Sequence, residues 1–424
     1  MNHIEYPKKS DWESLLKRPV FDTKSLEDRV VPILQQVKEK GDEVLKKFTL
    51  EFDKINIENL SVSDEEILEA EKLVSDELKK AIDIARINIE KFHLAQREEI
   101  KKMETSKGVI CWRKSVPISK VGLYIPGGTA PLFSTILMLG VPANIAGCEE
   151  IVLCTPPNKE GKIHPAILYT ASILGIRKIF KVGGAQAIAA MAYGTKTISQ
   201  VYKIFGPGNQ YVTAAKQLVN KEGIAIDMPA GPSELAVIAD QSCNPIFVAA
   251  DLLSQAEHGI DSQVILVTDS KVVIEEVEKE VAKQLEFLPR KEFAAKALEN
   301  SKMILVKDLD EAMELINVYA PEHLIIQVKD YDRLASMVKN AGSVFLGNYT
   351  PESAGDYASG TNHTLPTNGY AKAYSGVSLD SFVKKITFQH ISQEGIRIIG
   401  PVIEKMAAAE LLDAHKNAVS VRLV

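Results

Sequence analysis

Residues 150–194 read EIVLCTPPNKEGKIHPAILYTASILGIRKIFKVGGAQAIAAMAYG, and this stretch decides the class of fold. Two short β-rich runs, EIVLCTPP (150–157) and KIFKVGG (178–184), are each followed by an apolar segment typical of a buried helix. The neighbouring runs VGLYIP (121–126) and TISQVYKIFGPGN (197–209) are followed by helical segments in the same way. Strand then helix, repeated along the chain, predicts a parallel sheet with right-handed crossovers.

A second series of apolar runs begins at residue 235. LAVIAD (235–240) and QVILVT (263–268) flank a predicted helix at 244–258, and further strand-like runs follow. These further runs are MILV (303–306), HLIIQV (323–328) and SVFLG (343–347). The pattern predicts a second α/β unit.

The segments outside these units have a different pattern of residues. Residues 1 to about 100 are charged and show helical spacing, with Ser63 and Glu66 forming a capping box that opens one helix. The tail from Ser381 to Val424 predicts a helix at about 401–414 and then a short strand-like AVSVRL. We therefore expect a helical region before the α/β units and a small unit after them.

Composition narrows the class of protein. The chain has 424 residues, of which 46% are hydrophobic and 25% charged, as in a soluble globular protein of two or three domains. A net charge of -6 argues against non-specific binding to nucleic acid or to an anionic membrane. No apolar leader follows Met1, and the four cysteines show no Cys-x-x-Cys spacing. We expect free thiols and a cytoplasmic location.

Three glycine-rich loops follow predicted strands. They are Pro126-Gly127-Gly128, Gly183-Gly184 and Gly206-Pro207-Gly208-Asn209. Glycine lets the backbone approach a phosphate, and helix N-termini favour anions. Tight βα turns are the alternative for any single loop, because none matches a dinucleotide or P-loop motif. Together the loops favour a nucleotide or phosphate ligand, with Tyr124 and Gln186 offering stacking and amide contacts.

Several segments carry residues of the metal-ligand type. Gln255 and His258 are three apart near the end of the helix ADLLSQAEHG and share a face. The polar segment 351–367, which we expect to be a functional loop, contains Asp356 and His363, and the tail contains Glu410 and His415. His, Asp and amide oxygens suit Zn²⁺. For His258 alone, a favourable contact with the helix dipole is the simpler explanation.

The spacing of the two tail residues leaves their placement open. Glu410 and His415 are five apart and would not share a face of one continuous helix. Either the helix ends before His415, or the two residues serve the sites of different subunits.

A Glu-His pair opens the predicted strand at 323–328. Pro321 favours extended geometry for Ala320, and adjacent Glu322 and His323 on an extended chain point to opposite sides. His323 is suited to general-base work near neutral pH. The alternative is a surface Glu beside a half-buried His at a strand start.

Long motifs from about residue 20 to the end of the chain resemble the histidinol dehydrogenase family. They are GLYIPGGTAPLFSTILMLGVPA, VGGAQAIAAMAYGT, KIFGPGNQYV, AIDMPAGPSEL, DLLSQAEHGIDSQVIL, YAPEHLIIQ, GSVFLGNYTPESAGDYASGTNHTLPT and AHKNAVSVRL. The resemblance implies oxidation of L-histidinol to L-histidine through L-histidinal in two NAD⁺-dependent steps, with one Zn²⁺ per site. It also implies a homodimer that exchanges its C-terminal segment, so that each site uses tail residues of the partner.

The expected fold is α/β, with two Rossmann-like parallel-sheet domains, a helical N-terminal region and a small exchanged C-terminal domain. The expected boundaries are 1–21 for an N-terminal segment, 22–123 with 235–377 for the first α/β domain, 124–234 for an inserted NAD-binding domain, and 378–424 for the tail domain.

The resemblance also implies residue roles. The implied zinc ligands are Gln255, His258, Asp356 and His415, and the implied acid/base pair is Glu322 and His323. The implied substrate contacts are Ser233, Gln255, His258, His323, Asp356, Glu410 and His415. The implied NAD⁺ contacts are Tyr124, Gln186 and Asn209. Our hypothesis is that zinc orients the substrate, neutral His323 removes the hydroxyl proton and Glu322 activates water in the second step.

Three alternatives remain at this point. A related zinc- and NAD-dependent dehydrogenase would act on another amino alcohol. An aldehyde-dehydrogenase-like route would need a thiolate from Cys148 or Cys154. A zinc-binding protein without turnover would share the ligands. The ligand types do not separate Zn²⁺ from Mn²⁺ or Co²⁺, and His363 has no assigned role.

Overall fold

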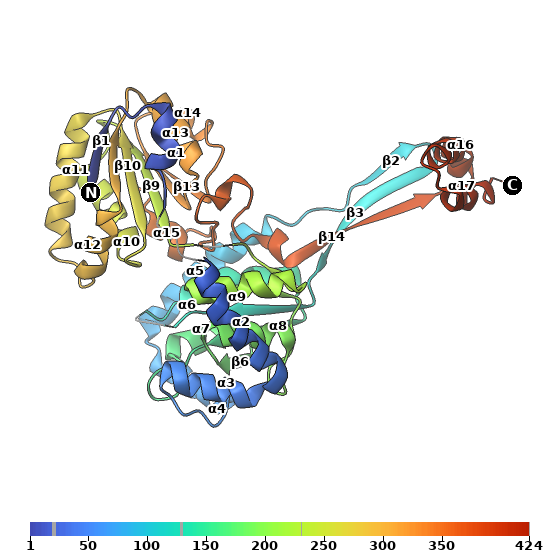
Figure 1. Cartoon of the computed structure of the whole chain (residues 1–424), viewed down its shortest axis with the longest axis horizontal. Coiled ribbons are helices and arrows are strands. Elements are labelled where there is room, and N and C mark those ends of the chain that lie inside the picture. The colour runs from blue at the N-terminus through green and yellow to red at the C-terminus, as the bar shows by residue number, and fades with distance from the viewer. Residues whose placement is uncertain (19–22, 128–129, 230, 424) are drawn as a thin grey trace.

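Two parallel sheets and a projecting arm make up the computed structural model, which describes residues 1–18, 23–127, 130–229 and 231–423 (Figure 1). The five-stranded sheet has the order β6-β5-β4-β7-β8 with all neighbours parallel. Its strands are β4 (Lys120–Tyr124), β5 (Glu150–Thr155), β6 (Lys178–Lys181), β7 (Lys203–Phe205) and β8 (Ala225–Ile226). The helices that follow four of them are α6 (Phe133–Ala146), α7 (Pro165–Ile173), α8 (Gly184–Tyr193) and α9 (Gln210–Lys221). The predicted strand-helix repeats are confirmed.

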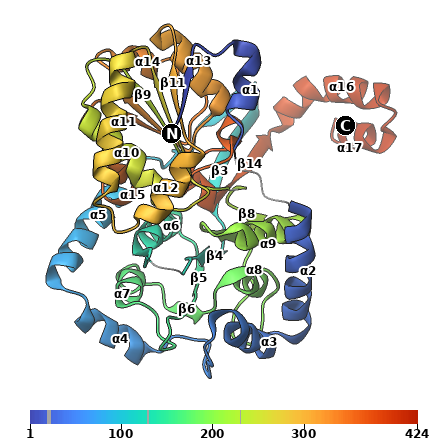
Figure 2. The ribbon, with the colours of Figure 1, turned by 60° about the vertical axis from the view of Figure 1, so that its left-hand side comes forward.

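The six-stranded sheet is the second α/β unit and has the order β1-β11-β10-β9-β12-β13, again with all neighbours parallel. Its strands are β1 (Asn2–Glu5), β9 (Glu234–Ala239), β10 (Gln263–Thr268), β11 (Lys302–Leu305), β12 (His323–Gln327) and β13 (Ser343–Leu346). One face packs on α10 (Pro245–Ala256), α11 (Lys271–Leu285) and α12 (Lys291–Glu299), and the other on α1 (Trp12–Leu15), α13 (Leu309–Tyr319) and α14 (Tyr331–Ala335) (Figure 2). The N-terminal β1 closes one edge of this sheet.

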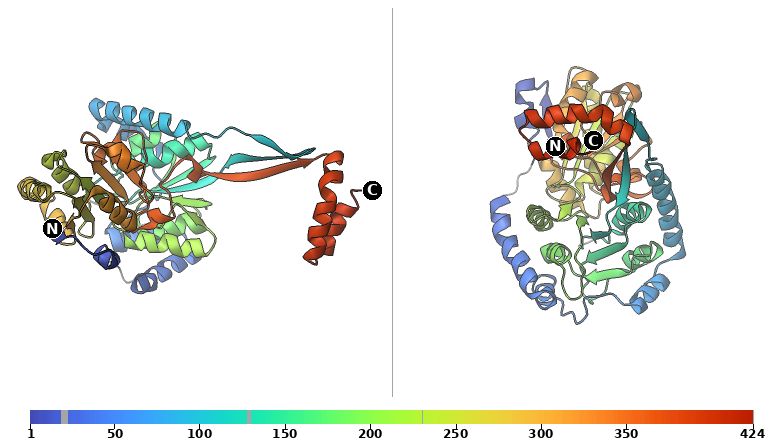
Figure 3. Two further views of the ribbon diagram at one scale, coloured as in Figure 1. Left: turned by 90° about the horizontal axis from the view of Figure 1, so that it is seen from above. Right: turned by 90° about the vertical axis from the view of Figure 1, so that its right-hand side faces the viewer.

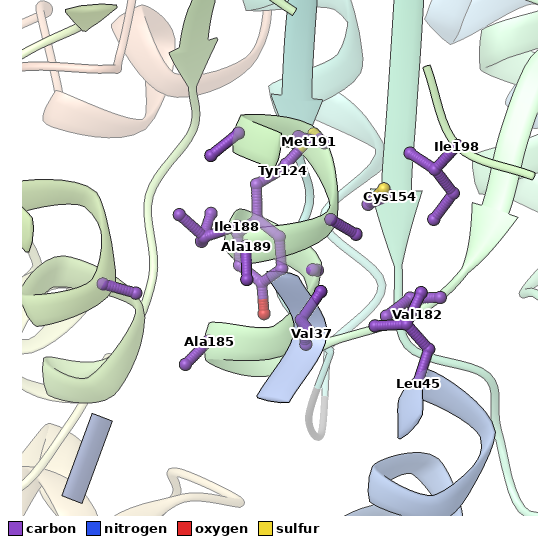
Figure 4. Packing of buried hydrophobic residues seen from close by; sticks show 14 of the residues in the cluster. Val37, Leu45, Tyr124, Cys154, Val182, Ala185, Ile188, Ala189, Met191 and Ile198 are labelled. Carbon is purple, nitrogen blue, oxygen red and sulfur yellow. The ribbon is translucent and has the colours of Figure 1, made fainter. Parts of the chain in front are cut away.

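The N-terminal helices wrap the five-stranded sheet. They are α2 (Thr23–Lys40), α3 (Asp42–Phe48), the short turn η2 (Thr49–Asp53), α4 (Asp64–Leu73) and α5 (Asp76–Leu94). Val37 and Leu45 share one hydrophobic cluster with Tyr124, Cys154 and Ile188 (Figure 4). The predicted capping box at the start of α4 is confirmed, because Ser63 and Glu66 exchange both bonds.

This packing differs from the expected boundaries, which group 22–123 with 235–377. Every residue of α6 from Ser134 to Ala143 is buried, so this helix needs cover on the side away from its sheet. Ile82 and Ile89 of α5 supply that cover, as Ile67 of α4 does for α7. The apolar faces of the N-terminal helices therefore belong to the core of the five-stranded sheet.

The arm extends well away from both sheets (Figure 3). It is a three-stranded antiparallel ribbon of β2 (Lys102–Ser106), β3 (Val109–Pro117) and β14 (Val383–Ile391), in the order β14-β3-β2. It carries α16 (Gln393–Ala409) and α17 (Asp413–Ser420). The strand predicted at AVSVRL is wrong, because α17 covers its first half and Val419 packs against Gly400 of α16. The remaining short elements are η1 (Lys9–Asp11), α15 (Glu352–Tyr357), η3 (Tyr370–Lys372) and η4 (Leu379–Phe382).

Within the described residues, no helix combines the length and the apolar character needed to cross a membrane. All four cysteines carry free thiols, as expected.

Candidate active site

A cavity of about 560 Å³ lies between the two sheets. The five-stranded sheet contributes its carboxyl end, through Pro126 after β4 and Asn209 after β7. The six-stranded sheet contributes its amino end, through Ser233 before β9 and His323 at the start of β12. Only the first of these follows the usual rule that ligands bind at the carboxyl ends of parallel strands.

Glu322 and His323 both line this cavity and are both buried. Glu322 Oε2 lies 3.7 Å from His323 Nδ1, so the two side chains do not point to opposite sides of an extended chain. The expected extended geometry of Ala320 is also wrong: its φ is +54° and it ends α13 in the left-handed conformation. Because the strand begins only at His323, the side chain of Glu322 does not have to point away from that of His323, as neighbouring side chains in a strand do.

The surroundings of the pair raise both pKa values. Burial raises the pKa of Glu322 to about 7. Burial lowers the pKa of His323, but the charges of Glu352, Glu322 and Asp356 outweigh it and raise that pKa to about 10. The pair therefore titrates near and above neutral pH, which is the behaviour expected of acid/base groups.

Four donor side chains gather beside the pair. His258, Glu352 and Asp356 each offer one atom within 4.8 Å of the others. The side-chain amide of Gln255 lies 3.1 Å from Glu352 Oε2. No lysine or arginine occurs among the described residues that line this cavity. The buried carboxyl of Glu352 and the half-buried carboxyl of Asp356 have no permanent cationic partner and lie next to an imidazole and an amide, which fits a divalent metal ion.

Glu352 is a site residue that sequence reasoning missed. It lies four residues before Asp356 in α15, within the segment 351–367 that we expected to be a loop throughout. The signal was the spacing of four, which places both carboxylates on one helix face. Ser254 Oγ donates to Glu352 Oε2 at 3.2 Å. Burial raises the pKa of Glu352 to about 8.

His363 joins the two halves of the site. Its Nδ1 donates to the Asp356 carbonyl at 2.9 Å, and its Nε2 lies 3.1 Å from Thr135 Oγ1 of α6. Burial lowers the pKa of His363. The side chain thus ties α15 to the five-stranded sheet.

The structure brings most of the predicted substrate residues together. Ser233, Gln255, His258, His323 and Asp356 all line the 560 Å³ cavity. Glu410 and His415 do not, because they are exposed on the arm (Figure 1). The helix does end between them, with Leu411 at a φ of +60°.

A larger cavity of about 1290 Å³ contains the predicted nucleotide residues Tyr124, Gln186 and Asn209. Tyr124 Oη accepts a bond from the Gly184 N–H at 3.0 Å. The Asn209 side chain caps α9 by accepting from the N–H groups of Tyr211 and Val212. Pro126, Gly127 and Asn209 line both cavities, so the two are adjacent. Gly128 of the predicted loop lies outside the described residues.

One glycine of these loops has a steric requirement. Gly206 has a φ of +124°, and a Cβ there would lie 2.0 Å from the Tyr124 carbonyl oxygen. Only glycine lets β7 and β4 end this close together.

The cysteines are poorly placed for nucleophilic work. Cys154 is fully buried in the core and Cys148 lies against the Phe382 carbonyl (Figure 4 shows Cys154). Burial raises the pKa of both thiols, that of Cys148 to about 12. Neither lines a cavity described above. A thiolate route therefore has no support from the geometry.

Residues 16–423 match a family model described as histidinol dehydrogenase. The chain belongs to the histidinol dehydrogenase family. It is 66% identical over 423 residues to the histidinol dehydrogenase of Bacteroides thetaiotaomicron, covering 100% of this chain and 99% of that protein. It is 54% identical over 417 residues to the chloroplastic histidinol dehydrogenase of Arabidopsis thaliana, covering 98% and 89%.

A solved histidinol dehydrogenase structure, from Elizabethkingia anophelis, superposes with a TM-score of 0.98 at 56% identity. The alignment covers 100% of this chain and 98% of that one. As a member of the histidinol dehydrogenase family, the protein is an oxidoreductase. The resemblance predicted from the motifs is confirmed.

Proposed function

We propose that the protein oxidises L-histidinol to L-histidine through L-histidinal, in two successive NAD⁺-dependent hydride transfers at a site with one Zn²⁺, as the last steps of histidine biosynthesis. One observation carries the proposal: a buried Glu-His pair and a metal-type donor cluster line one cavity, which adjoins a second cavity of nucleotide size. The names of the relatives support histidinol as the substrate.

We assign Gln255, His258 and Asp356 as metal ligands of the chain's own site. Glu352 packs on the same cluster and adds a second carboxyl group to it. When bound, Zn²⁺ would orient the amino alcohol through its nitrogen donors and polarise its oxygen. The two carboxylates also suit the ammonium group of the substrate.

His323 takes the proton in the first oxidation. As the alcohol carbon gives up its hydrogen as hydride to the nicotinamide, His323 accepts the hydroxyl proton and the carbonyl of histidinal forms. The Nε2 of His323 is buried and has no hydrogen-bond partner, which leaves it available for this contact. A dication among the neighbouring carboxylates would oppose their effect on the His323 pKa and favour the neutral base.

Glu322 takes the proton in the second oxidation. Its carboxylate removes a proton from water as the water oxygen bonds to the aldehyde carbon. The resulting anion of the aldehyde hydrate gives up a hydride to a second NAD⁺ and becomes the carboxylic acid. A pKa raised by burial to about 7 suits a base at neutral pH.

We propose Tyr124, Gln186 and Asn209 as contacts of NAD⁺. Their common position in the larger cavity, at the carboxyl end of the five-stranded sheet, supports this assignment. Asn209 begins α9, so bound phosphates would meet a helix N-terminus.

We also propose a homodimer that exchanges its arms, which would bring Glu410 and His415 to the partner's site together with the partner's own Ser233. The exposed position of both tail residues, on an arm that projects from the chain's own site, supports exchange (Figure 3). The four free thiols support work in a reducing compartment such as the cytoplasm.

The deciding experiment is formation of NADH from L-histidinol, NAD⁺ and Zn²⁺ by the purified protein. We expect two NADH for each histidinol consumed, L-histidine as product, and loss of activity after chelation. A panel of other amino alcohols runs beside it, and a better substrate in that panel would replace histidinol in the proposal. Failure to turn over any of them would overturn it. Cys148→Ala serves as the control and should keep full activity.

A further inference from the structure

Glu234 contacts both members of the acid/base pair through its main chain. Its N–H donates to Glu322 Oε2 at 3.0 Å. Its carbonyl lies 3.3 Å from His323 Nδ1. A carbonyl oxygen only accepts, so this bond requires the hydrogen on Nδ1. A neutral His323 then keeps its free lone pair on Nε2, which lies 3.6 Å from Asp356 Oδ1 of the donor cluster.

The Glu234 side chain is fixed in turn by Arg18. Arg18 Nε donates to Glu234 Oε1 at 2.5 Å and Nη2 donates to Oε2 at 2.8 Å. The Asn368 N–H adds a third bond, to Glu234 Oε1 at 2.6 Å. The glutamate side chain is 3% exposed and that of Arg18 14%, so the pair is desolvated and geometrically restrained.

Arg18 also contacts Tyr319, which lies three residues before Glu322 in the chain. Its Nη2 donates to the Tyr319 carbonyl at 2.6 Å, and its guanidinium lies 4.1 Å from the centre of the Tyr319 ring. Tyr319 Oη donates to Gln263 Oε1 of β10. Tyr319 is the last residue of α13, directly before the left-handed turn at Ala320. One guanidinium therefore contacts both Glu234, whose main chain bonds to the pair, and the turn that precedes Glu322.

We propose that Arg18, which lies outside both cavities, is a positioning residue that orients Glu322 and His323 through Glu234 and Tyr319. The inference rests on the proposed function, because it concerns the same pair. It differs from a purely stabilising ion pair in what it predicts: removing Arg18 slows chemistry in the folded enzyme and leaves ligand binding intact.

The test is Arg18→Met in the zinc-loaded full-length enzyme. We expect kcat to fall about 10-fold to 100-fold with both histidinol and histidinal, because a small misplacement of reacting groups is costly. KM for either substrate and for NAD⁺, and the zinc content, should stay within about twofold of wild type. Arg18→Lys keeps the charge but not the two-pronged contact, so its kcat should be intermediate.

Two further variants separate positioning from stability. Arg18→Met with Glu234→Gln leaves no unpaired buried charge, so it should recover thermal stability while kcat stays low. Lys181→Met is the matched control, since Lys181 forms a partly buried pair with Glu66 at 2.5 Å outside both cavities. It should lower Tm and leave kcat unchanged.

A stable double variant with wild-type kcat would overturn the proposal, and so would an Arg18→Met enzyme whose only change is in KM or Tm. Failure of the proposed function is seen separately, as absence of NADH formation by the wild-type protein.

Discussion

Two adjacent residues, Glu322 and His323, lie where burial and charge shift both of their pKa values. Burial raises the pKa of Glu322 to about 7, and three carboxylates raise that of His323 to about 10 against the effect of burial. The same environment that makes them costly to bury makes them useful near neutral pH.

Glu322→Gln should reduce turnover of histidinal more than turnover of histidinol, because only the second oxidation needs an activated water. In the wild-type enzyme the base form of Glu322 exists above its pKa, so the rate with histidinal should rise as pH passes through about 7. Separate assays of the two half-reactions against pH measure both effects. Equal losses in the two half-reactions would contradict the division of roles.

His323→Asn should lower kcat by about 100-fold or more while zinc content stays at the wild-type level, since His323 acts on the proton and is not assigned as a ligand. Steady-state kinetics and metal analysis of the same sample measure this. The assignment is wrong if the variant loses zinc and regains its rate when zinc is restored.

Some of these site residues could be predicted from the sequence, and others could not. The segment Tyr319-Ala320-Pro321-Glu322-His323 was visible as a candidate pair, and Gln255 with His258 as candidate ligands. Glu352 was hidden because α15 is short and lies inside a polar segment that resembles a loop. Glu234 and Arg18 were hidden because they meet only through contacts between distant parts of the chain.

At the scale of elements, α10 and β12 are joined by a buried polar pair. Gln327 Nε2 donates to Asp251 Oδ2 at 2.8 Å, while Gln327 Oε1 has no partner. Burial raises the pKa of Asp251 from 3.8 to about 7. Burial causes this upward shift of the Asp251 pKa, and the bond from Gln327 opposes it.

Asp251→Asn should therefore raise stability, and more so at pH 8 than at pH 5. A raised carboxyl pKa favours the folded state fully below 3.8, and this contribution is lost as pH rises through about 7. An asparagine can exchange both amide bonds with Gln327 at every pH. We expect a gain of about 1–4 kcal/mol at pH 8 and less at pH 5, seen as a difference in Tm. The same gain at both pH values would contradict the shifted titration.

Asn209 gives a prediction about α9. Asn209→Asp keeps the N-cap, because aspartate caps as well as asparagine, but it adds negative charge beside the proposed phosphate position. We expect an unchanged Tm and a KM for NAD⁺ raised about fivefold or more. Asn209→Ala is the comparison, since it should lower Tm through loss of the cap. An aspartate variant with wild-type KM would place the cofactor elsewhere.

The elements differ in how far local sequence determines them. The βα units of the five-stranded sheet were predictable, because apolar strands and helices alternate there without interruption. The surface on which the N-terminal helices pack was not predictable, because their apolar stripes fit any apolar surface. Their position is determined by the apolar outer faces of α6 to α8, which need to be covered. The end of the tail was predicted wrongly because Val419 and Val421 alternate as in a strand, whereas Val419 lies in α17 and packs against Gly400 of α16 and Val421 is exposed after the end of α17.

At the scale of the whole molecule, the site exists only where the two sheets face each other. The five-stranded sheet supplies Asn209 and Pro126, and the six-stranded sheet supplies His323 and Asp356. His363, bonded to Thr135, ties the two halves directly. The count of two or three domains from chain length does not show this dependence, because it does not say which ends of the domains meet.

Mixing inactive chains tests whether arms are exchanged. His415→Ala and Glu322→Gln chains are unfolded together, refolded and assayed with histidinal, the substrate for which Glu322 is required. If each site uses the partner's arm, one site of every mixed dimer has both wild-type residues, and about a quarter of wild-type activity should return. If the residues of one site come from one chain, mixing restores nothing. Sedimentation of each variant alone controls for dimer formation.

The arm also determines how late in folding the native structure can be completed. Its strand β3 pairs from Val109 to Pro117 with β14, and nearly all of both parallel sheets lies between the two strands in the chain. Contacts between such distant segments close a large loop and form late in folding. Both sheets can pack while β14 is still being synthesised, whereas the ribbon cannot. Any exchange of arms therefore takes place between chains that are already largely folded, and the rate of that encounter depends on protein concentration.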